Sequence, residues 1–184
     1  MVDPKRIVAQ GFDHIGERYA TWSLRTRVAE REHYTALLLD RLAPGARVLD
    51  LGCGTGTPTT ATLAQHFHVT GVDISARQIE LAKHNVPQAV FVQSDIATLD
   101  FPPAHFDAVI AFYSLFCLPR AELFPLLQQI ASWLKPEGLF VAALGAQDVE
   151  GFIAPDWLGV PMYWSLFDSA TNQRLIQEAG LQLL

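Results

Sequence analysis

Five short apolar runs recur along the middle of the chain, and segments with helical patterns separate them. The runs are Arg47–Leu51, Val69–Val72, Ala89–Val92, Phe106–Phe112 and Leu139–Leu144. Their hydrophobicity is continuous rather than alternating, which is typical of strands covered on both faces. Strands of this kind that alternate with helices predict a doubly wound α/β fold, with a mainly parallel sheet and helices on both faces.

Two of the intervening segments carry clear helix signals. In Arg120–Leu134, leucines and an isoleucine recur at helical spacing, and Lys135 and Pro136 follow at the end. Ala76–His84 follows Ser75, with Gln78 three positions later, which predicts a capping box. Both segments therefore predict helices that cross between neighbouring strands.

The 184 residues predict a single domain with three parts. Residues 1–42 form a helical N-terminal cap, residues 43–145 form the core, and residues 146–184 form a cover and an incomplete C-terminal part. We expect residues 145–168, rich in glycine, proline and aromatic residues, to be an irregular cover over the ligand edge of the sheet. A last helix near Thr171–Ala179 should end at Gly180, with the start of a short strand after it.

Composition and charge exclude several kinds of protein. Half of the residues are apolar, and the net charge is −6 with only 13 scattered basic residues, which argues against nucleic acid as the main partner. Cys53 and Cys117 are too few for a disulfide framework or a structural zinc site, and His66 and His68 lack an acidic or cysteine partner at metal-ligand spacing, so we predict no metal. The charged first residues and the lack of a long apolar stretch predict no signal peptide, no membrane partner and a cytoplasmic location.

The stretch VLDLGCGTGT, Val48–Thr57, places three glycines directly after the first apolar run. Glycine permits positive φ and lets a ligand approach the backbone, and in open α/β sheets ligands bind at the carboxyl ends of the strands. Thr57 followed by Pro58 reads as a cap and a first-turn proline, so a helix should start there. A plain tight turn is the alternative interpretation, because the glycine pattern alone is weak evidence.

The ends of the next two strands supply further parts of an adenosine site. Asp73 ends the second run, about 21 residues after Gly52, where a carboxylate can accept both hydroxyls of a ribose. It can also be a helix N-cap, although Ser75 already serves there. Asp95 and Ile96 follow the third run and suit an adenine, with the acid accepting from the amino group; a solvated loop acid is an equally open interpretation of Asp95.

The glycine spacing bears on which adenosine cofactor is bound. Nicotinamide dinucleotides usually require G-x-G-x-x-G, whereas the spacing here is G-x-G-x-G, with Pro58 removing a donor from the helix start. Asp50 would add negative charge near a pyrophosphate and would instead favour a cation. These features argue against a nicotinamide oxidoreductase, which a cofactor-binding assay would decide.

Five ordered segments together resemble the class I S-adenosylmethionine-dependent methyltransferases, a Rossmann-like family. VLDLGCGTGT resembles the first motif of that family, VTGVDIS the second-strand motif and SDIATLDF the adenine loop. FDAVIAFYSLFCLP resembles the fourth-strand motif, and LKPEGLFVAAL the turn into the fifth strand. The resemblance runs from about Arg47 to Leu144 and implies S-adenosylmethionine as the cofactor of the core, residues 43–145.

The resemblance also implies roles for individual residues. At the methionine end, Asp50 should hold the ammonium indirectly, and the backbone after the fourth strand should accept from it at Phe112. The first glycine turn should lie against the cofactor through Gly52, Cys53 and Gly54. At the other end, the ribose and adenine should contact Asp73, Ile74, Asp95 and Ile96. Tyr19 should close over the cofactor by likeness to small-molecule members, or else only anchor the cap as a half-buried aromatic residue.

Few residues are candidates for a catalytic role. His14, in the cap, is a possible general base, although a lone histidine is more often a surface or capping residue. Tyr113 and Tyr163 could orient an acceptor, or either could belong to the core. If the acceptor is already nucleophilic, orientation in line with the S–CH₃ bond requires no catalytic side chain.

The cover segment indicates the kind of acceptor. Large apolar side chains crowd into sixteen residues: Phe152, Trp157, Met162, Tyr163, Trp164 and Phe167. They read as the wall of an apolar acceptor pocket or as a small satellite core, and both can hold. AFYS, after the fourth strand, lacks the motif of amino-methylating enzymes of DNA and proteins. These features favour methyl transfer to a small, rather apolar acceptor, with a non-catalytic binder of S-adenosylmethionine or S-adenosylhomocysteine as the alternative.

The family sheet normally has seven strands, and the last two form an antiparallel hairpin. The printed sequence ends at Leu184, inside what would be the sixth strand, so we expect that hairpin to be incomplete. An uncovered sheet edge would favour a homodimer.

Overall fold

The computed structural model describes residues 3–184, so the first two residues of the predicted cap, residues 1–42, lie outside the described part. Its helices and strands alternate as the apolar runs predicted. In chain order they are α1 (Pro4–Ile15), α2 (Glu17–Ser23), α3 (Val28–Arg41), β1 (Arg47–Leu51), α4 (Thr59–Leu63), β2 (His68–Asp73), α5 (Ala76–Asn85), β3 (Val90–Gln93), η1 (Ile96–Thr98), β4 (Phe106–Ala111), η2 (Leu115–Cys117), α6 (Arg120–Trp133), β5 (Leu134–Ala142), β6 (Val149–Trp157), β7 (Val160–Leu166) and α7 (Ser169–Glu178).

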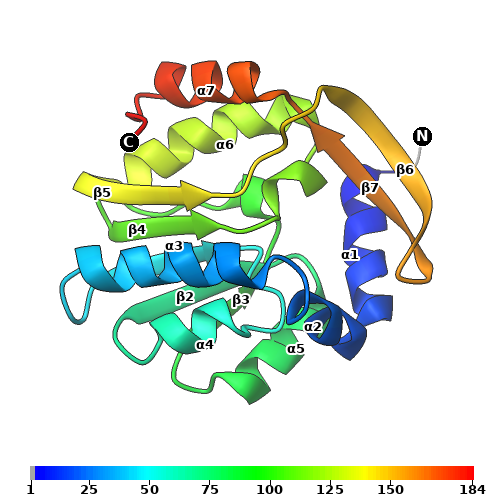
Figure 1. Cartoon of the computed structure of the whole chain (residues 1–184), viewed down its shortest axis with the longest axis horizontal. Helices are drawn as coiled ribbons and strands as arrows, with labels where there is room; N and C mark the ends of the chain where they lie inside the picture. Colours follow the sequence, from blue (N-terminus) through cyan, green and yellow to red (C-terminus); the bar gives the residue numbers. More distant parts are fainter. Residues whose placement is uncertain (1–2) are drawn as a thin grey trace.

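The five predicted strands form one parallel sheet in the order β3-β2-β1-β4-β5 (Figure 1). Consecutive residues of β4 point to opposite faces of this sheet. Val109 belongs to a core with α6 and α7, whereas Ala108 and Ile110 belong to a core with α3 and α4. Both faces are therefore covered, which confirms the doubly wound fold and explains why the strands read as continuous apolar runs.

Part of the C-terminal prediction is wrong. Residues 149–166 are not irregular but form an antiparallel hairpin, β6–β7, in a sheet of its own. Leu158 and Gly159 make the two-residue turn with φ of 54° and 86°, the pair of positive φ values that a tight hairpin turn of the I′ type needs. Pro155 is tolerated because a two-stranded sheet leaves each strand an outer edge without ladder hydrogen bonds.

The hairpin and α1 lie together beyond the carboxyl ends of the sheet strands (Figure 1). Buried Val160 and Met162 of β7 pack against Val8 and Ile15 of α1 in a small separate core. The position of the cover over the ligand edge is thus as expected, and the satellite-core interpretation of Met162 applies.

The end of the chain also differs from expectation. Residues 181–184 form no strand after Gly180, and within residues 3–184 the strand β5 has a sheet partner on one side only. The homodimer therefore stays a prediction. No helix in this part of the chain is long and apolar enough to cross a membrane.

Candidate cofactor and acceptor site

The glycine turn after β1 has the conformation that its sequence predicted. Gly52, Gly54 and Gly56 all have positive φ, at 79°, 54° and 76°. The backbone N–H groups of Gly52 and Cys53 both donate to the Val72 carbonyl of β2, at 2.7 and 3.0 Å. A Cβ atom on Gly52 would collide with the side chain of Ser114, so this position requires glycine for space as well as for φ.

The helix after the turn starts later than expected. α4 begins at Thr59, with Pro58 at its N-cap position, and no side chain caps it. The predicted Thr57 cap is wrong, because the Thr57 hydroxyl pairs with the Thr55 hydroxyl at 3.0 Å instead. A helix of five residues with a proline at its start offers few free N–H groups to a pyrophosphate, in line with the argument against a nicotinamide dinucleotide.

Asp73 links the glycine turn to the start of α5. Its Oδ2 accepts from the Gly54 N–H and its Oδ1 from the Ser75 N–H, each at 2.9 Å. Each oxygen keeps a second lone pair, so the carboxylate can still accept from a ligand. Burial raises the pKa of Asp73 to about 6, and the backbone hydrogen bonds from Ser75 and Gly54 oppose the shift.

Asp95 is held by the N-terminal cap, a contact that no sequence pattern indicated. Its Oδ1 accepts from the Ala97 N–H at 2.9 Å, and its Oδ2 lies 2.6 Å from the ammonium of Lys5 in α1. Lys5 also pairs with Glu122 of α6 at 2.9 Å. Asp95 is therefore a cap of η1 and an ion-pair partner rather than a solvated loop acid.

A first cavity of about 60 Å³, here called the cofactor-side cavity, lies at this edge of the sheet. Eight of the ten predicted cofactor residues line it: Tyr19, Gly52, Gly54, Asp73, Ile74, Asp95, Ile96 and Phe112. The two carboxylates come from neighbouring strand ends, and Ile74 and Ile96 supply apolar surface. Carboxylates for hydroxyl and amino donors, with apolar surface for a flat ring, fit an adenosine.

Asp50 and Cys53 lie outside the lining of the cofactor-side cavity. They line a smaller neighbouring cavity together with Gly52 and Phe112. Asp50 is buried and accepts from the Thr60 hydroxyl at 2.6 Å; burial raises its pKa to about 7. Cys53 packs with the core between α5 and β3, so only its backbone belongs to the turn surface.

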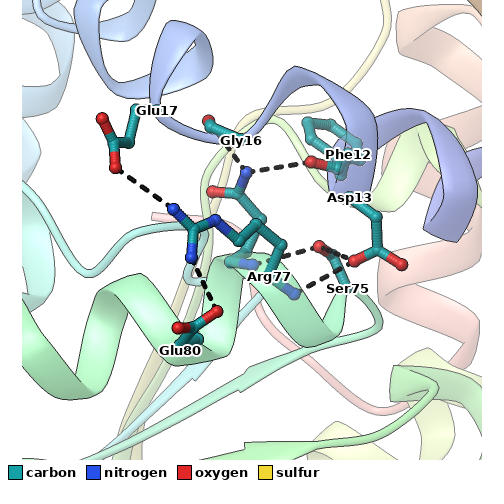
Figure 2. A network of polar contacts seen from close by, with 8 residues as sticks. Phe12, Asp13, Gly16, Glu17, Ser75, Arg77 and Glu80 are labelled. Atoms are coloured by element: carbon teal, nitrogen blue, oxygen red, sulfur yellow. Dashed lines mark hydrogen bonds and ion pairs between the residues drawn. The ribbon is translucent and has the colours of Figure 1, made fainter.

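The cap is fastened to the start of α5 by a network of polar contacts (Figure 2). Asp13 of α1 accepts from the Ser75 hydroxyl at 2.6 Å and from the Arg77 N–H at 3.0 Å. Ser75 caps α5 by accepting from the Gln78 N–H, as predicted. The Gln78 side chain does not complete a capping box, because it donates instead to the carbonyls of Phe12 and Gly16, at 3.2 Å each.

A second and larger cavity of about 630 Å³, here called the acceptor-side cavity, adjoins the first. Its walls come from the cap, from the segments after β4 and β5, and from the hairpin. Of the six predicted cover residues, Phe152, Trp157 and Trp164 line it. Phe12, Tyr19 and Tyr113 line both cavities, so they stand where the two meet.

The three catalytic candidates lie in different surroundings. Tyr113 has a φ of 63° and lines both cavities, and its buried hydroxyl has no hydrogen-bond partner in the described part of the chain. His14 is on the exposed face of α1 and lines neither cavity. Tyr163 lines neither cavity and places its hydroxyl against Gly151 in the hairpin. The geometry therefore brings only Tyr113 to the place where a reaction would occur.

The sheet order, the glycine turn and the strand-end acids define a class of protein, an α/β protein with an adenosine-cofactor site at its switch point. The family described as "Methyltransferase domain" matches residues 48–138. An uncharacterised methyltransferase of Synechocystis sp. is 33% identical over 154 residues, which cover 81% of this chain and 70% of that protein.

A 27-O-demethylrifamycin SV methyltransferase of Amycolatopsis mediterranei is 37% identical over 60% of this chain and 44% of its own length. Magnesium protoporphyrin IX methyltransferase from Synechocystis, solved with bound S-adenosylmethionine, has a TM-score of 0.73 at 22% identity and covers all of this chain and 89% of its own. The chain belongs to the class I S-adenosylmethionine-dependent methyltransferases, and S-adenosylmethionine is the cofactor of that family.

Proposed function

We propose that this chain transfers the methyl group of S-adenosylmethionine to a small, mainly apolar acceptor in the acceptor-side cavity. The observation that carries the proposal is the shared lining of the two cavities by Phe12, Tyr19 and Tyr113. The two cavities therefore adjoin, so that a cofactor in one and an acceptor in the other would be neighbours, and methyl transfer requires this proximity. The similarity to a methyltransferase named for 27-O-demethylrifamycin SV supports a small-molecule acceptor.

The cofactor residues act by binding and orientation. Asp73 accepts from the ribose hydroxyls and Asp95 from the adenine amino group, while Ile74 and Ile96 pack on the ring. Gly52 and Gly54 allow the methionine part to approach the turn, and Cys53 contributes only backbone. Asp50 acts on the ammonium indirectly, because it lies outside the lining of the cofactor-side cavity and lines only the smaller neighbouring one.

Bound S-adenosylmethionine supplies an electrophilic methyl group on sulfur. The protein's part is to hold the acceptor in line with that group and to exclude water, which can lower the barrier by about 7–11 kcal/mol. Burial raises the pKa of Tyr113 to about 12, and the Glu30 carboxylate acts in the same direction. At neutral pH the Tyr113 hydroxyl is therefore a hydrogen-bond donor that positions an acceptor, not a general base.

The cap must move when the cofactor enters. The cofactor-side cavity of about 60 Å³ is far below the roughly 300–1,000 Å³ of typical small-molecule sites. Tyr19 lies so close to the glycine turn that a Cβ on Gly54 would be 3.1 Å from its ring. Outward movement of α1 and α2 would open the cavity, and their return would exclude water.

Calorimetry tests the first half of this proposal. S-adenosylmethionine and S-adenosylhomocysteine should bind and NAD should not; Asp73→Ala should lose the binding, while the exposed Asp40→Ala on α3 should keep it. Transfer from methyl-labelled S-adenosylmethionine to a panel of small apolar phenols, amines and carbon acids tests the second half. Binding without transfer to any acceptor would favour the non-catalytic alternative, and tight NAD binding would contradict the proposal outright.

A further inference from the structure

The acceptor-side cavity is strongly aromatic. Nine of its twenty lining residues carry aromatic rings, against 10% of the whole chain, so a flat apolar ligand would find ring surfaces on several sides. Trp157 is central, with ring centroids 5.5 Å from Trp22 and 5.1 Å from Trp164, both at nearly perpendicular angles. This arrangement favours a planar molecule over a flexible aliphatic chain.

The same cavity is locally positive although the chain carries a net charge of −6. Among the residues that line it, two are arginines, Arg27 and Arg31, and one is an acid, Glu30. The net charge of the lining at neutral pH is therefore +1. Arg27 and Glu30 are largely exposed and pair with each other at 3.4 Å. The remaining cation, Arg31, has no carboxylate partner among residues 3–184.

Arg31 is held in place with donor capacity to spare. The residue is only 7% exposed, and both hydrogen bonds that its guanidinium donates leave from Nη2, to the carbonyls of Ser23 and Thr26. Its Nε is buried without a hydrogen-bond partner. A buried arginine with neither a paired anion nor a full set of acceptors is costly, and an anionic ligand would offset that cost.

Tyr113 is beside this cation and is also incompletely satisfied. The Arg31 Cζ lies 5.6 Å from the Tyr113 ring centroid, and the Tyr113 hydroxyl makes no hydrogen bond within 3.5 Å to residues 3–184, although the Glu30 carboxylate is close enough to raise its pKa. Arg31 of α3 and Tyr113 after β4 are thus neighbours in the wall of the aromatic cavity, and Arg31 also lines the smaller cavity that contains Asp50 and the glycine turn. A carboxylate or phenolate oxygen could accept from both groups.

We propose that the acceptor is a flat, apolar molecule with one anionic oxygen group, and that Arg31 and the Tyr113 hydroxyl bind this group. The inference rests on the proposed function in one respect, because it takes the occupant of this cavity to be the methyl acceptor. It adds a charge requirement to the acceptor and gives Arg31 a role in specificity.

The test compares 2-naphthoate with neutral 2-naphthamide by calorimetry on the whole chain, without cofactor. We expect 2-naphthoate to bind at least tenfold more tightly, since hydrogen bonds to a charged group are the strong ones. Arg31→Gln should abolish this preference and leave the Kd of 2-naphthamide within about threefold. Arg41→Gln, an exposed arginine on the same helix, should leave both affinities unchanged.

A second variant keeps the test decisive if Arg31→Gln weakens both probes through its contacts to Ser23 and Thr26. Tyr113→Phe removes a hydroxyl that has no partner within 3.5 Å in the described chain and has the Glu30 carboxylate near it, and it should weaken 2-naphthoate alone by about tenfold. Equal binding of the two probes to the parent chain would overturn the proposal, as would binding of neither. So would a preference that survives in both Arg31→Gln and Tyr113→Phe.

Failure of this proposal and failure of the proposed function give different results. Methyl transfer to neutral acceptors, without a preference for anions, would contradict the anion-binding role of Arg31 and support the proposed methyltransferase function. The chain could instead prefer the anion through Arg31 and yet neither bind S-adenosylmethionine nor transfer methyl groups. That result would support an anion-binding cavity and contradict the proposed function.

Discussion

Asp50 should make the folded chain less stable as the pH rises from 5 to 8. The carboxyl group is 4% exposed, and its Oδ2 accepts from the Thr60 hydroxyl. Burial raises its pKa to about 7, against an ordinary value of 3.8. Between these two values the folded state holds a proton that the unfolded state has released, so stability falls as the pH rises through this window.

The size of the effect follows from the two pKa values. At pH 5 the raised pKa costs about 1.5 kcal/mol of folding free energy, and at pH 8 it costs about 4 kcal/mol. Asp50→Asn removes the titration and keeps an oxygen for Thr60, but it adds a buried amide donor at a cost of about 1–3 kcal/mol that does not depend on pH. Between pH 5 and pH 8 the free energy of unfolding of Asp50→Asn should therefore rise by about 2.5 kcal/mol relative to that of the parent. The cost of the buried amide does not affect this change, because that cost is the same at both pH values.

Urea unfolding of the parent and of Asp50→Asn at pH 5 and pH 8 measures this gain directly. In thermal unfolding it corresponds to a relative shift of about 5–10 °C in Tm for a domain of this size. The exposed Asp40→Asn on α3 makes the same charge change at the surface and should show no such pH dependence. A difference between parent and Asp50→Asn that is equal at both pH values would refute the reasoning.

Three further substitutions test the site. In Asp73→Asn an amide replaces a carboxylate that accepts from two backbone N–H groups, so S-adenosylmethionine should bind at least tenfold more weakly. The affinity of the parent chain for S-adenosylmethionine should fall as the pH drops through about 6, because Asp73 is then protonated. A flat pH profile by calorimetry would contradict this. Gly52→Ala should lower the free energy of unfolding in urea by well over 3 kcal/mol, because the new Cβ collides with Ser114. Gly180→Ala, at φ 91° with open space around it, should lower it by only about 1–2 kcal/mol. Equal losses in the two variants would mean that backbone strain alone matters. Asp13→Ala should loosen the cap and raise the dissociation rate of S-adenosylmethionine, followed by stopped-flow tryptophan fluorescence, and an unchanged rate would show that the cap does not limit release.

The cofactor side of the site was predictable because its signals are local. Apart from Tyr19 in the cap, the predicted residues lie near the end of an apolar run or just after it, and the carboxyl ends of parallel strands meet at one edge of the sheet. Asp73 and Asp95 thus come to one cavity without any contact that the sequence had to specify at long range. The same logic does not distinguish the backbone of Cys53 from its side chain, which packs in the core.

The hairpin was not predictable from composition, because its strands contain the residues that usually mark loops. Gly151 is required where the Tyr163 hydroxyl would lie 2.7 Å from an added Cβ, and Pro155 stands in a two-stranded sheet with free outer edges. The alternation of β7 is visible only in the structure, where Val160 and Met162 are buried while Pro161 between them is exposed. The sequence VPMYWSL is apolar almost throughout, so it offers no period-two hydrophobic pattern from which the strand could be predicted.

Arg31, which we propose as a site residue, was not among the candidates from the sequence. It lies on the buried stripe of α3 with Thr35 and Leu38, at positions i, i+4 and i+7, and all three are less than 10% exposed. A charge on the buried stripe of a helix must find a partner or face a cavity that brings one, because burial of an unpaired charge is costly. Lys5 offered no such pattern, since its partners Asp95 and Glu122 lie 90 or more positions away along the chain and only the fold brings them together. The burial of the Arg31 stripe is visible only in the structure, and an ion pair between distant elements likewise has no local signal in the sequence.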